Sequence, residues 1–235
     1  FKRVDKPLLI TIAVLLVFGL VLFSSAALGV LAVNEIKFYS VLRSQLMFAL
    51  LGGAFVLSLG LLIPYQLYRK YAYHLFGIAL FITLLVFIPG LSVYHGGAHR
   101  WIDLHFITIQ PSEGLKITFV MVVALWCSTK RNLFKDWRYG LLPFALTAGL
   151  VAVIMLLQPD LGTCLVILSG GFIVYFIGGA RKNHILLLFV FAIAGGLLLL
   201  SVKPYMVERI KTFLNGDHDP RGSSWQLNQS LIAIG

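Results

Sequence analysis

The sequence has few charged residues: Asp, Glu, Lys and Arg make up 12% of its 235 residues, whereas hydrophobic residues make up 59%. Its mean hydropathy is +0.92. Soluble domains carry about 25% charged residues, so this composition excludes a soluble domain and is typical of a polytopic helical membrane protein. The net charge of +10 could indicate binding to nucleic acid, but the basic residues cluster in short loops between apolar runs. Membrane topology accounts for that placement, and we expect no nucleic-acid partner.

The sequence also lacks the motifs of soluble enzymes: it has no P-loop, no GxGxxG after a strand, no HExxH and no CxxC pair. Its two cysteines, Cys127 and Cys164, fall near the end of one apolar run and the start of another. We expect them to lie at opposite membrane faces, too far apart for a disulfide, and to be packing residues. The adjacent acidic and imidazole groups in 217–219 cannot all point at one ion on a regular element. We predict no metal site built from the chain alone.

Long apolar runs predict an all-α membrane domain over residues 1–235, with seven spans and the start of an eighth near Trp225. Residues 203–224 are predicted to form an extracytoplasmic loop with a short amphipathic helix in the interface plane. The chain begins at Phe1 and stops just inside an apolar run, so we expect it to belong to a longer protein. The predicted spans are Leu8–Val33, Gln45–Ile63, Tyr71–Val93, Pro111–Ser128, Tyr139–Leu157, Leu161–Ala180 and Ile185–Val202.

The distribution of Lys and Arg predicts the orientation of these spans. With the N-terminus in the cytoplasm, that side carries 11 basic residues and the other side 7, four of which lie in one long loop. Over short loops the bias is 11 against 3, so the positive-inside rule favours a cytoplasmic N-terminus. The stretch from His99 to Glu113 and the connector Gln158-Pro159-Asp160 are then both predicted to face outward.

The stretch from His99 to Lys116 contains an unusual concentration of ionisable groups for so apolar a chain. Pro111-Ser112-Glu113 is typical of a helix start, which places Glu113 and Lys116 on one face of the new helix. An ionisable residue inside a span costs about 2.5–3.5 kcal/mol at the bilayer centre and less near the ends, so Lys116 is a functional candidate. The structural alternative is a lysine that reaches the interface and is neutralised by Glu113.

Other candidates have structural alternatives of the same kind. Trp101 could belong to an aromatic belt, Asp160 could cap the following helix, and the paired glycines at 52–53, 170–171 and 195–196 indicate close helix–helix approach. What favours function is convergence, because five residues are predicted at one membrane face. A positive cluster at a helix start suits an anionic group such as a phosphate. The five residues are Arg100, Trp101, Glu113, Lys116 and Asp160.

Three segments form a series in the order of the chain: Gly97–Ile102 with Gln110–Glu113 and Lys116; Gln158–Thr163; and Asp219–Gly222 with Gln226 and Gln229–Gly235. This series resembles the motifs of the SEDS family, the FtsW/RodA/SpoVE group, and it covers the whole chain. The form of the last motif favours the division branch (FtsW-like), whereas Asp160-Leu161 would equally suit the elongation branch (RodA-like). The matching motif positions are Pro111, Ser112, Pro159, Gly162, Thr163, Gln229 and Ser230.

The resemblance implies a ten-span peptidoglycan glycosyltransferase of the bacterial cytoplasmic membrane, which polymerises lipid II on the outer face. It implies a class B penicillin-binding transpeptidase as partner and a divalent cation, Mg or Mn, at the substrate diphosphate, with no organic cofactor. The substrate-binding residues would be Arg100, Trp101, Glu113, Lys116, Gln158 and Asp160.

The resemblance also implies that the catalytic Asp lies beyond Gly235, so that the 235-residue chain alone would be inactive. Two departures from the family pattern, at Gly114 and at Ser224-Trp225, concern local packing. Two other functions remain open on the sequence: a transporter that moves lipid-linked precursors across the membrane, and a non-catalytic scaffold for the transpeptidase.

Overall fold

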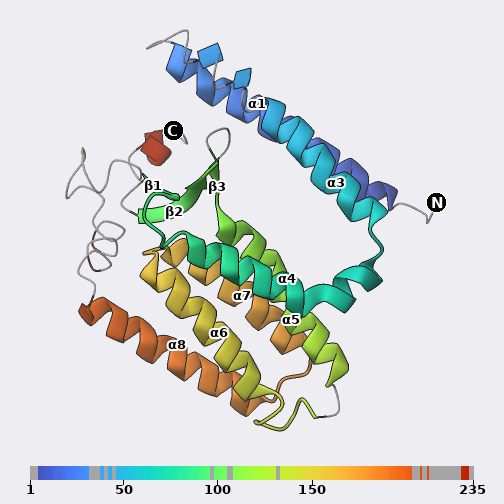
Figure 1. Ribbon diagram of the computed structural model, residues 1–235, viewed down its shortest axis with the longest axis vertical. Helices are drawn as coiled ribbons and strands as arrows, with labels where there is room; N and C mark the ends of the chain where they lie inside the picture. The colour runs from blue at the N-terminus through green and yellow to red at the C-terminus, as the bar shows by residue number, and fades with distance from the viewer. Residues whose placement is uncertain are drawn as a thin grey trace. The chain divides into compact units, whose positions relative to one another are not determined.

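The computed structural model describes residues 5–31, 38–39, 42–43, 46–95, 98–104, 108–130, 133–202, 207, 211 and 229–232. The chain divides into two compact units, Phe1–Lys70 and Tyr71–Gly235. Figure 1 labels the helices and strands. Most of the described chain is helical, which confirms the predicted helical class.

The first unit contains α1 (Lys6–Leu31), the π-helix η1 (Met47–Gly52), α3 (Gly53–Leu62) and the first residues of α4 (Tyr65–Leu85). Helix α3 ends because Ile63 precedes a proline and takes an extended conformation, with ψ of 119°. Pro64 then starts α4, and its carbonyl accepts a bond from the Leu67 N–H at 2.9 Å. Residues 65–70, which lie between the second and third predicted spans, therefore form the first helical turns of α4.

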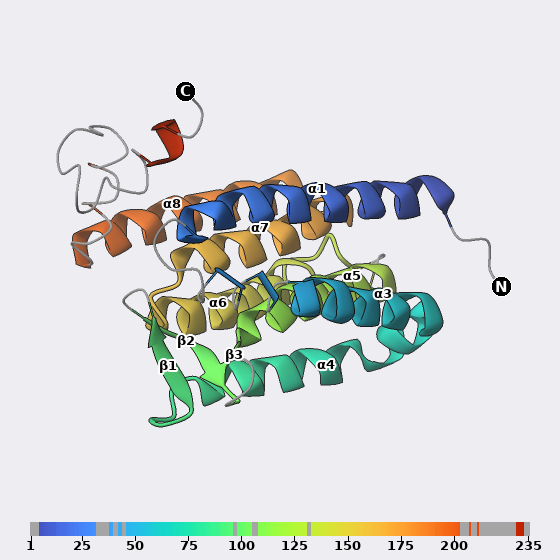
Figure 2. The ribbon, with the colours of Figure 1, turned by 90° about the horizontal axis from the view of Figure 1, so that it is seen from above.

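The second unit contains the rest of α4 together with α5 (Pro111–Thr129), α6 (Leu141–Leu157), α7 (Leu161–Ile177) and α8 (Lys182–Val202). These helices lie at the positions of the third to seventh predicted spans; the ends of α5 to α8 differ by at most three residues, whereas α4 begins six residues earlier and ends eight residues earlier than predicted. Helix α7 packs against both α5 and α6 (Figure 2). Its Tyr175 stacks on Phe144 of α6 with ring centroids 4.4 Å apart, and Phe119 of α5 completes the buried aromatic core.

A three-stranded antiparallel sheet lies at one end of the second unit (Figures 1 and 2). Strand β2 (Ala98–Asp103) pairs with β1 (Ser92–His95) on one side and with β3 (Thr108–Ile109) on the other. The sequence did not predict this sheet, and the expected third span over Tyr71–Val93 was too long. Helix α4 ends at Leu85, and the chain reverses near Gly90, whose φ of +90° suits glycine.

The paired glycines divide into two kinds. A Cβ at Gly171 would lie 2.2 Å from the ring of Phe119, and one at Gly170 would lie 3.3 Å from Val120, so this pair does mark the close approach of α7 to α5. For 52–53 and 195–196 the same interpretation stays a prediction, because no described atom lies within 4 Å of a Cβ built at these positions.

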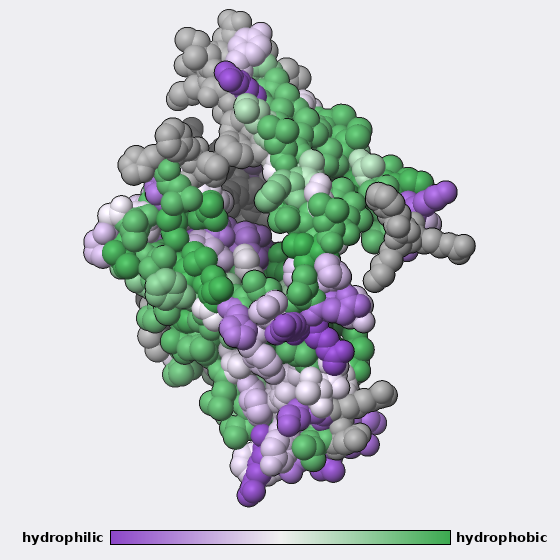
Figure 3. All heavy atoms as spheres, turned by 45° about the vertical axis from the view of Figure 1, so that its right-hand side comes forward, coloured by the Kyte–Doolittle hydropathy of each residue, from purple (hydrophilic) through white to green (hydrophobic). Residues whose placement is uncertain are grey.

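The described helices are covered with exposed apolar side chains, as Figure 3 shows for one face. Three of them, α1, α5 and α8, are long and apolar enough to cross a membrane, or four spans if the bent pair Leu50–Leu62 and Tyr65–Leu85 counts as one. Helices α6 and α7 are apolar but have 17 residues each. Buried Cys127 and Cys164 are both free and lie at opposite ends of the helical bundle, in the last turn of α5 and the first turn of α7.

Several predictions fall outside the described residues. Almost all of the 203–224 loop, with its amphipathic helix and the 217–219 cluster, lies there, as do Gln226 and the last three residues. The division of the chain into one membrane domain with that outer loop stays a prediction. Residues 229–232 are helical and exposed, where the start of an eighth span was expected.

Candidate functional site

All six predicted substrate-binding residues lie at the sheet end of the second unit. Arg100 and Trp101 lie on β2, whereas Glu113 and Lys116 lie in the first turns of α5. Helix α6 ends and α7 begins at the same end (Figure 1), which places the remaining two residues there. Gln158 is the C-cap of α6 and Asp160 is the N-cap of α7. The residues that the sequence predicts at one membrane face thus lie at one end of the second unit.

The connector between α6 and α7 organises this end. Gln158 is buried, and its side-chain amide donates to the carbonyl oxygen of Thr83 at 3.0 Å. Thr83 lies in the last turn of α4, where backbone carbonyls lack helical partners. The Thr83 hydroxyl is bonded to Ala79 within its own helix. Gln158 therefore joins the end of α6 to the end of α4 through a buried hydrogen bond.

Asp160 connects three further elements. Its Oδ1 accepts the N–H of Thr163 at 3.3 Å, which caps α7, as the structural interpretation of this residue predicted. Its Oδ2 accepts a hydrogen bond from the side chain of Gln110 at 3.3 Å, just before α5. The same carboxylate lies 3.8 Å from the guanidinium of Arg100 on β2. Asp160 is both a cap and the centre of a polar group that ties the sheet, α5 and α7 together.

Arg100 is held by the connector on two sides. One terminal nitrogen donates to the carbonyl of Pro159, and the other faces Asp160. Its Nε is buried and has no acceptor among the described residues. A buried N–H without an acceptor is unfavourable, so the guanidinium retains an unused donor beside the connector. We call Arg100, Gln110, Gln158 and Asp160 the connector cluster.

Glu113 and Lys116 form a separate ion pair one turn into α5, with N–O distances of 2.8 Å to both carboxylate oxygens. The Glu113 side chain is 60% exposed and that of Lys116 is 28% exposed. Among the described residues, no hydrogen bond or ion pair joins this pair to the connector cluster. Arg100 is about as exposed, at 26%, so the two cations differ in how firmly they are held rather than in how accessible they are.

The remaining motif residues have local roles. Trp101 is half-buried opposite Val93 in the sheet. Pro111 and Ser112 are buried at the start of α5, and Pro111 occupies the first helical positions as predicted. Gly162 has no described atom within 4 Å of an added Cβ, so space does not require glycine there. Gln229 and Ser230 are exposed on the short 229–232 segment.

The sequence analysis missed Thr83, and it named Gln110 only as part of a family motif, with no contact assigned to it. Thr83 was one hydroxyl within an apolar run, and its contribution is a backbone carbonyl, which no residue type reveals. Gln110 precedes the Pro-Ser-Glu helix start, so its position before a helix was visible. Its contact with Asp160 could not be predicted, because it depends on how α5 and α7 approach each other.

The described residues do not fit a metal centre held by the protein. None of them form a group of three His, Cys, Asp or Glu side chains that could ligate an ion. The acidic residues at this end are already engaged, Asp160 by Arg100 and Gln110 and Glu113 by Lys116. We derive no step of the chemistry through a metal.

The comparisons with known proteins agree with this arrangement. The FTSW/RODA/SPOVE family model, described as cell cycle protein, matches residues 6–235. The probable peptidoglycan glycosyltransferase FtsW of Trichlorobacter lovleyi is 35% identical over 98% of this chain and 60% of its own length. The stage V sporulation protein E of Bacillus subtilis is 32% identical over 98% of this chain and 63% of its own. The chain thus spans about 60% of the length of these curated relatives.

Solved structures show the same likeness. A chain from a study of "Structural coordination of polymerization and crosslinking by a peptidoglycan synthase complex" matches with a TM-score of 0.74 and 30% identity, over 100% of this chain and 66% of that one. The rod shape determining protein RodA of Thermus thermophilus matches with a TM-score of 0.57 and 30% identity, over 77% and 57% of the two chains. With motifs, fold and family model in agreement along its whole length, the chain belongs to the FtsW/RodA/SpoVE family of polytopic membrane proteins.

Proposed function

We propose that the protein to which this chain belongs is a peptidoglycan glycosyltransferase that polymerises lipid II. Relatives that match nearly the whole chain carry that activity in their names. The observation that carries the proposal for this chain is the gathering of two cations, Arg100 and Lys116, at the end of the bundle where α5 and α7 begin. Such a site suits a substrate whose leaving group is a diphosphate.

In the proposed reaction, a sugar hydroxyl of one lipid-linked disaccharide attacks the anomeric carbon of another. The new glycosidic C–O bond forms while the bond from that carbon to the diphosphate oxygen breaks, and undecaprenyl diphosphate leaves with the bonding electrons. The hydroxyl proton passes to a general base. Arg100 and Lys116 stabilise the negative charge that develops on the leaving diphosphate.

The general base is proposed to lie outside the connector cluster. Asp160 is a poor candidate, because its side chain is 7% exposed and its oxygens are engaged by Arg100, Gln110 and the Thr163 N–H. A carboxylate in the outer loop that follows the last described helix is the base that the family resemblance implies. A divalent cation, if used, would be held by the diphosphate itself rather than by a ligand set of this chain.

We further propose that the protein lies in the bacterial cytoplasmic membrane with its N-terminus inside, so that the connector cluster faces outward. The bias of basic residues over short loops supports this orientation. We propose a class B penicillin-binding transpeptidase as partner, because the structural neighbour comes from work on a complex that polymerises and crosslinks peptidoglycan.

Purified full-length protein, with its transpeptidase, tests the proposal directly. We expect it to convert lipid II into glycan polymer, and we expect a protein of these 235 residues alone to make none. Movement of labelled lipid II across vesicles without polymer formation would instead indicate a transporter. Neither polymer nor movement, with transpeptidase binding intact, would indicate a scaffold.

A further inference from the structure

The end of the second unit opposite the sheet carries two connections, one between α5 and α6 and the other between α7 and α8 (Figure 1). The described residues of these connections are rich in cations, and they lie far along the bundle from the proposed reaction site. Neither connection takes part in the chemistry proposed above. The cations are Lys130, Lys135, Arg138, Arg181 and Lys182.

Two clefts open at this end. One has a volume of about 580 Å³ and brings Lys135 and Trp137 of the first connection beside Arg181 of the second and His184 in the first turn of α8. Its acidic residue, Asp136, is engaged, since its carboxylate accepts the Arg138 N–H at 3.1 Å. No carboxylate among the described residues lies within salt-bridge distance of Lys135 or Arg181. The cleft therefore holds two cations that form no salt bridge with a described carboxylate, together with the one carboxylate of Asp136.

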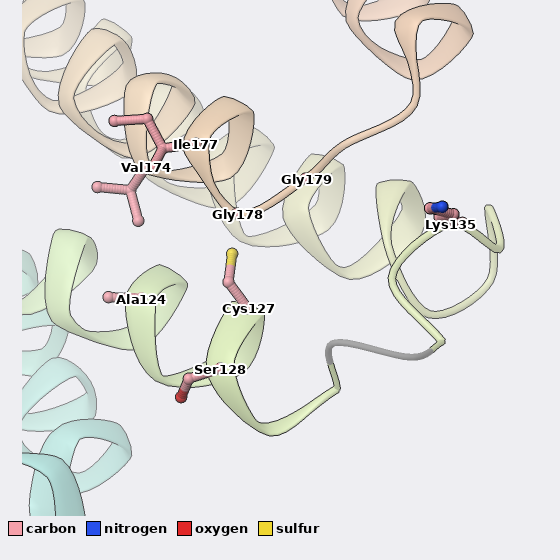
Figure 4. A pocket seen from close by; sticks show the side chains of 8 residues that line it. All are labelled: Ala124, Cys127, Ser128, Lys135, Val174, Ile177, Gly178 and Gly179. Atoms are coloured by element: carbon pink, nitrogen blue, oxygen red, sulfur yellow. The ribbon is translucent and has the colours of Figure 1, made fainter.

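The second cleft, of about 750 Å³, is lined mainly by small and aliphatic residues, and it shares Lys135 with the first. It lies between the last turn of α5 and the last turn of α7, and Figure 4 shows Cys127 pointing toward Gly178 across it. Apart from Lys135, its lining is small or aliphatic, with one hydroxyl from Ser128. A basic cleft and an apolar cleft thus meet at one lysine.

The first connection is held in a defined conformation. Phe134 is fully buried, 5.0 Å from the ring of Tyr175 and 5.6 Å from that of Trp126. A Cβ at Gly140 would lie 2.1 Å from the Phe134 carbonyl, so only glycine fits where the connection enters α6. Lys135 and Trp137 therefore extend from a fixed support, while exposed Trp137 and Tyr139 are of the type that marks a membrane boundary.

We propose that the two clefts form one binding site for an anionic membrane phospholipid. Its phosphodiester headgroup binds between Lys135 and Arg181, and its glycerol and upper acyl chains lie in the apolar cleft along α5 and α7. Charge complementarity selects the headgroup, and the adjoining apolar cleft selects an amphiphile over a soluble anion. In the proposed orientation this end faces the cytoplasm, where membrane leaflets carry anionic lipid. The inference does not depend on the glycosyltransferase activity.

The test uses full-length protein in bilayers and measures how strongly spin-labelled phosphatidylglycerol associates relative to spin-labelled phosphatidylcholine. We expect the native protein to show a clear preference for phosphatidylglycerol. The double variant that combines Lys135→Gln with Arg181→Gln should reduce this preference about fivefold for each cation removed. The matched control is Lys130→Gln with Lys182→Gln, which removes the same charge from residues that line neither cleft. The control should change the preference less than about twofold.

A second variant, Ala124→Phe, fills the apolar cleft and leaves every charge in place, so it should also lower the preference. Retention of the native thermal unfolding midpoint shows that each variant is folded. The single variant Lys135→Arg, with Arg181 unchanged, keeps both positive charges and should bind the lipid as the native protein does. Equal effects of the two charge pairs, or no preference in the native protein, would overturn the proposal. Displacement of the labelled lipid by excess inorganic phosphate, or an unchanged preference in Ala124→Phe, would show a site for a soluble anion instead.

Discussion

The guanidinium of Arg100 on β2 lies 3.8 Å from the carboxylate of Asp160 at the start of α7. The same guanidinium donates to the backbone carbonyl of Pro159. The sheet is thereby fixed to the turn between two helices of the bundle. Arg100 therefore connects β2 to this turn, and the turn as well as β2 determines where its positive charge lies.

Removing the Asp160 carboxylate should loosen the sheet end of the second unit. Asp160→Ala loses the cap of α7, the acceptor of Gln110 and the partner of Arg100 in one step. We expect a loss of about 1–3 kcal/mol in unfolding free energy, because a capping residue contributes about 1 kcal/mol and the other two groups lose a buried partner. The measurement is the midpoint of thermal unfolding of the purified protein in detergent.

The matched control is Asp5→Ala at the start of α1. Asp5 accepts the Leu8 N–H at 3.1 Å and so caps its helix in the same way, but it is exposed. Its loss should cost about 0.5–1 kcal/mol at most. Equal shifts for the two variants would show that Asp160 is a cap and nothing more.

The buried bond between Gln158 and Thr83 makes a second prediction. Gln158→Leu fills a similar volume but leaves the carbonyl of Thr83 without its donor. An unsatisfied buried acceptor costs about 1–3 kcal/mol, so the variant should unfold at lower temperature, and amide exchange at the end of α4 should quicken. Thr83→Val is the control, since it removes a hydroxyl bonded within its own helix and keeps the carbonyl. If Thr83→Val is the more damaging change, the hydroxyl rather than the connector holds α4.

The approach of α7 to α5 depends on Gly171. Gly171→Ala places a methyl group 2.2 Å from the buried ring of Phe119, and overpacking of this kind costs about 1–3 kcal/mol. Gly149→Ala in α6 meets no described atom within 4 Å and gains helix propensity, so it should be neutral or stabilising. Comparing their thermal unfolding midpoints separates the packing effect from the effect of alanine itself. Similar midpoints would mean that the helices can move apart without cost.

The sequence predicted the helices well where apolar runs are bounded by proline, glycine or charge. Pro111 starts α5 as predicted, and the Gln158-Pro159-Asp160 connector separates α6 from α7. It failed between Leu85 and Asp103, because short strands in a polar stretch between spans have no long alternating pattern. The same apolar residues continue past Leu85, so hydropathy alone extended the third span into β1.

The candidate site was predicted in its location but not in its contacts. Helix ends and motif order were enough to place Arg100, Lys116 and Asp160 at one end of the bundle. Whether a cation pairs with a neighbour on its own helix or with a residue far along the chain depends on tertiary packing. Lys116 pairs locally with Glu113, which the spacing predicted, whereas Arg100 pairs across the connector, which no spacing could show.

The orientation of the spans can be tested with cysteine labelling. The native cysteines, Cys127 and Cys164, are buried and should give little background. A cysteine introduced at Asp103 should react with a membrane-impermeant reagent in intact cells, and one introduced at Lys130 should react only after the membrane is opened. The bias of basic residues is the physical reason for this expectation. The reverse pattern would place the connector cluster in the cytoplasm and contradict the proposed function.

The role of Lys116 separates a diphosphate site from a purely structural ion pair. Lys116→Met in the full-length protein keeps the apolar stem and removes the charge, whereas Glu113→Gln breaks the same ion pair and leaves the lysine charged. If Lys116 binds the diphosphate, its charge-assisted contact is worth about 1.5–3 kcal/mol, so Lys116→Met should lower the rate of lipid II polymerisation roughly 10- to 150-fold. Glu113→Gln should lower that rate far less, because the cation that meets the substrate remains.

If the pair serves only to let α5 enter the membrane, the methionine variant should insert and polymerise normally. The measurement is the amount of glycan polymer made at matched membrane levels of each variant, and transpeptidase binding serves as the check on folding. A near-normal rate for Lys116→Met, or equal losses for both variants, contradicts the diphosphate assignment.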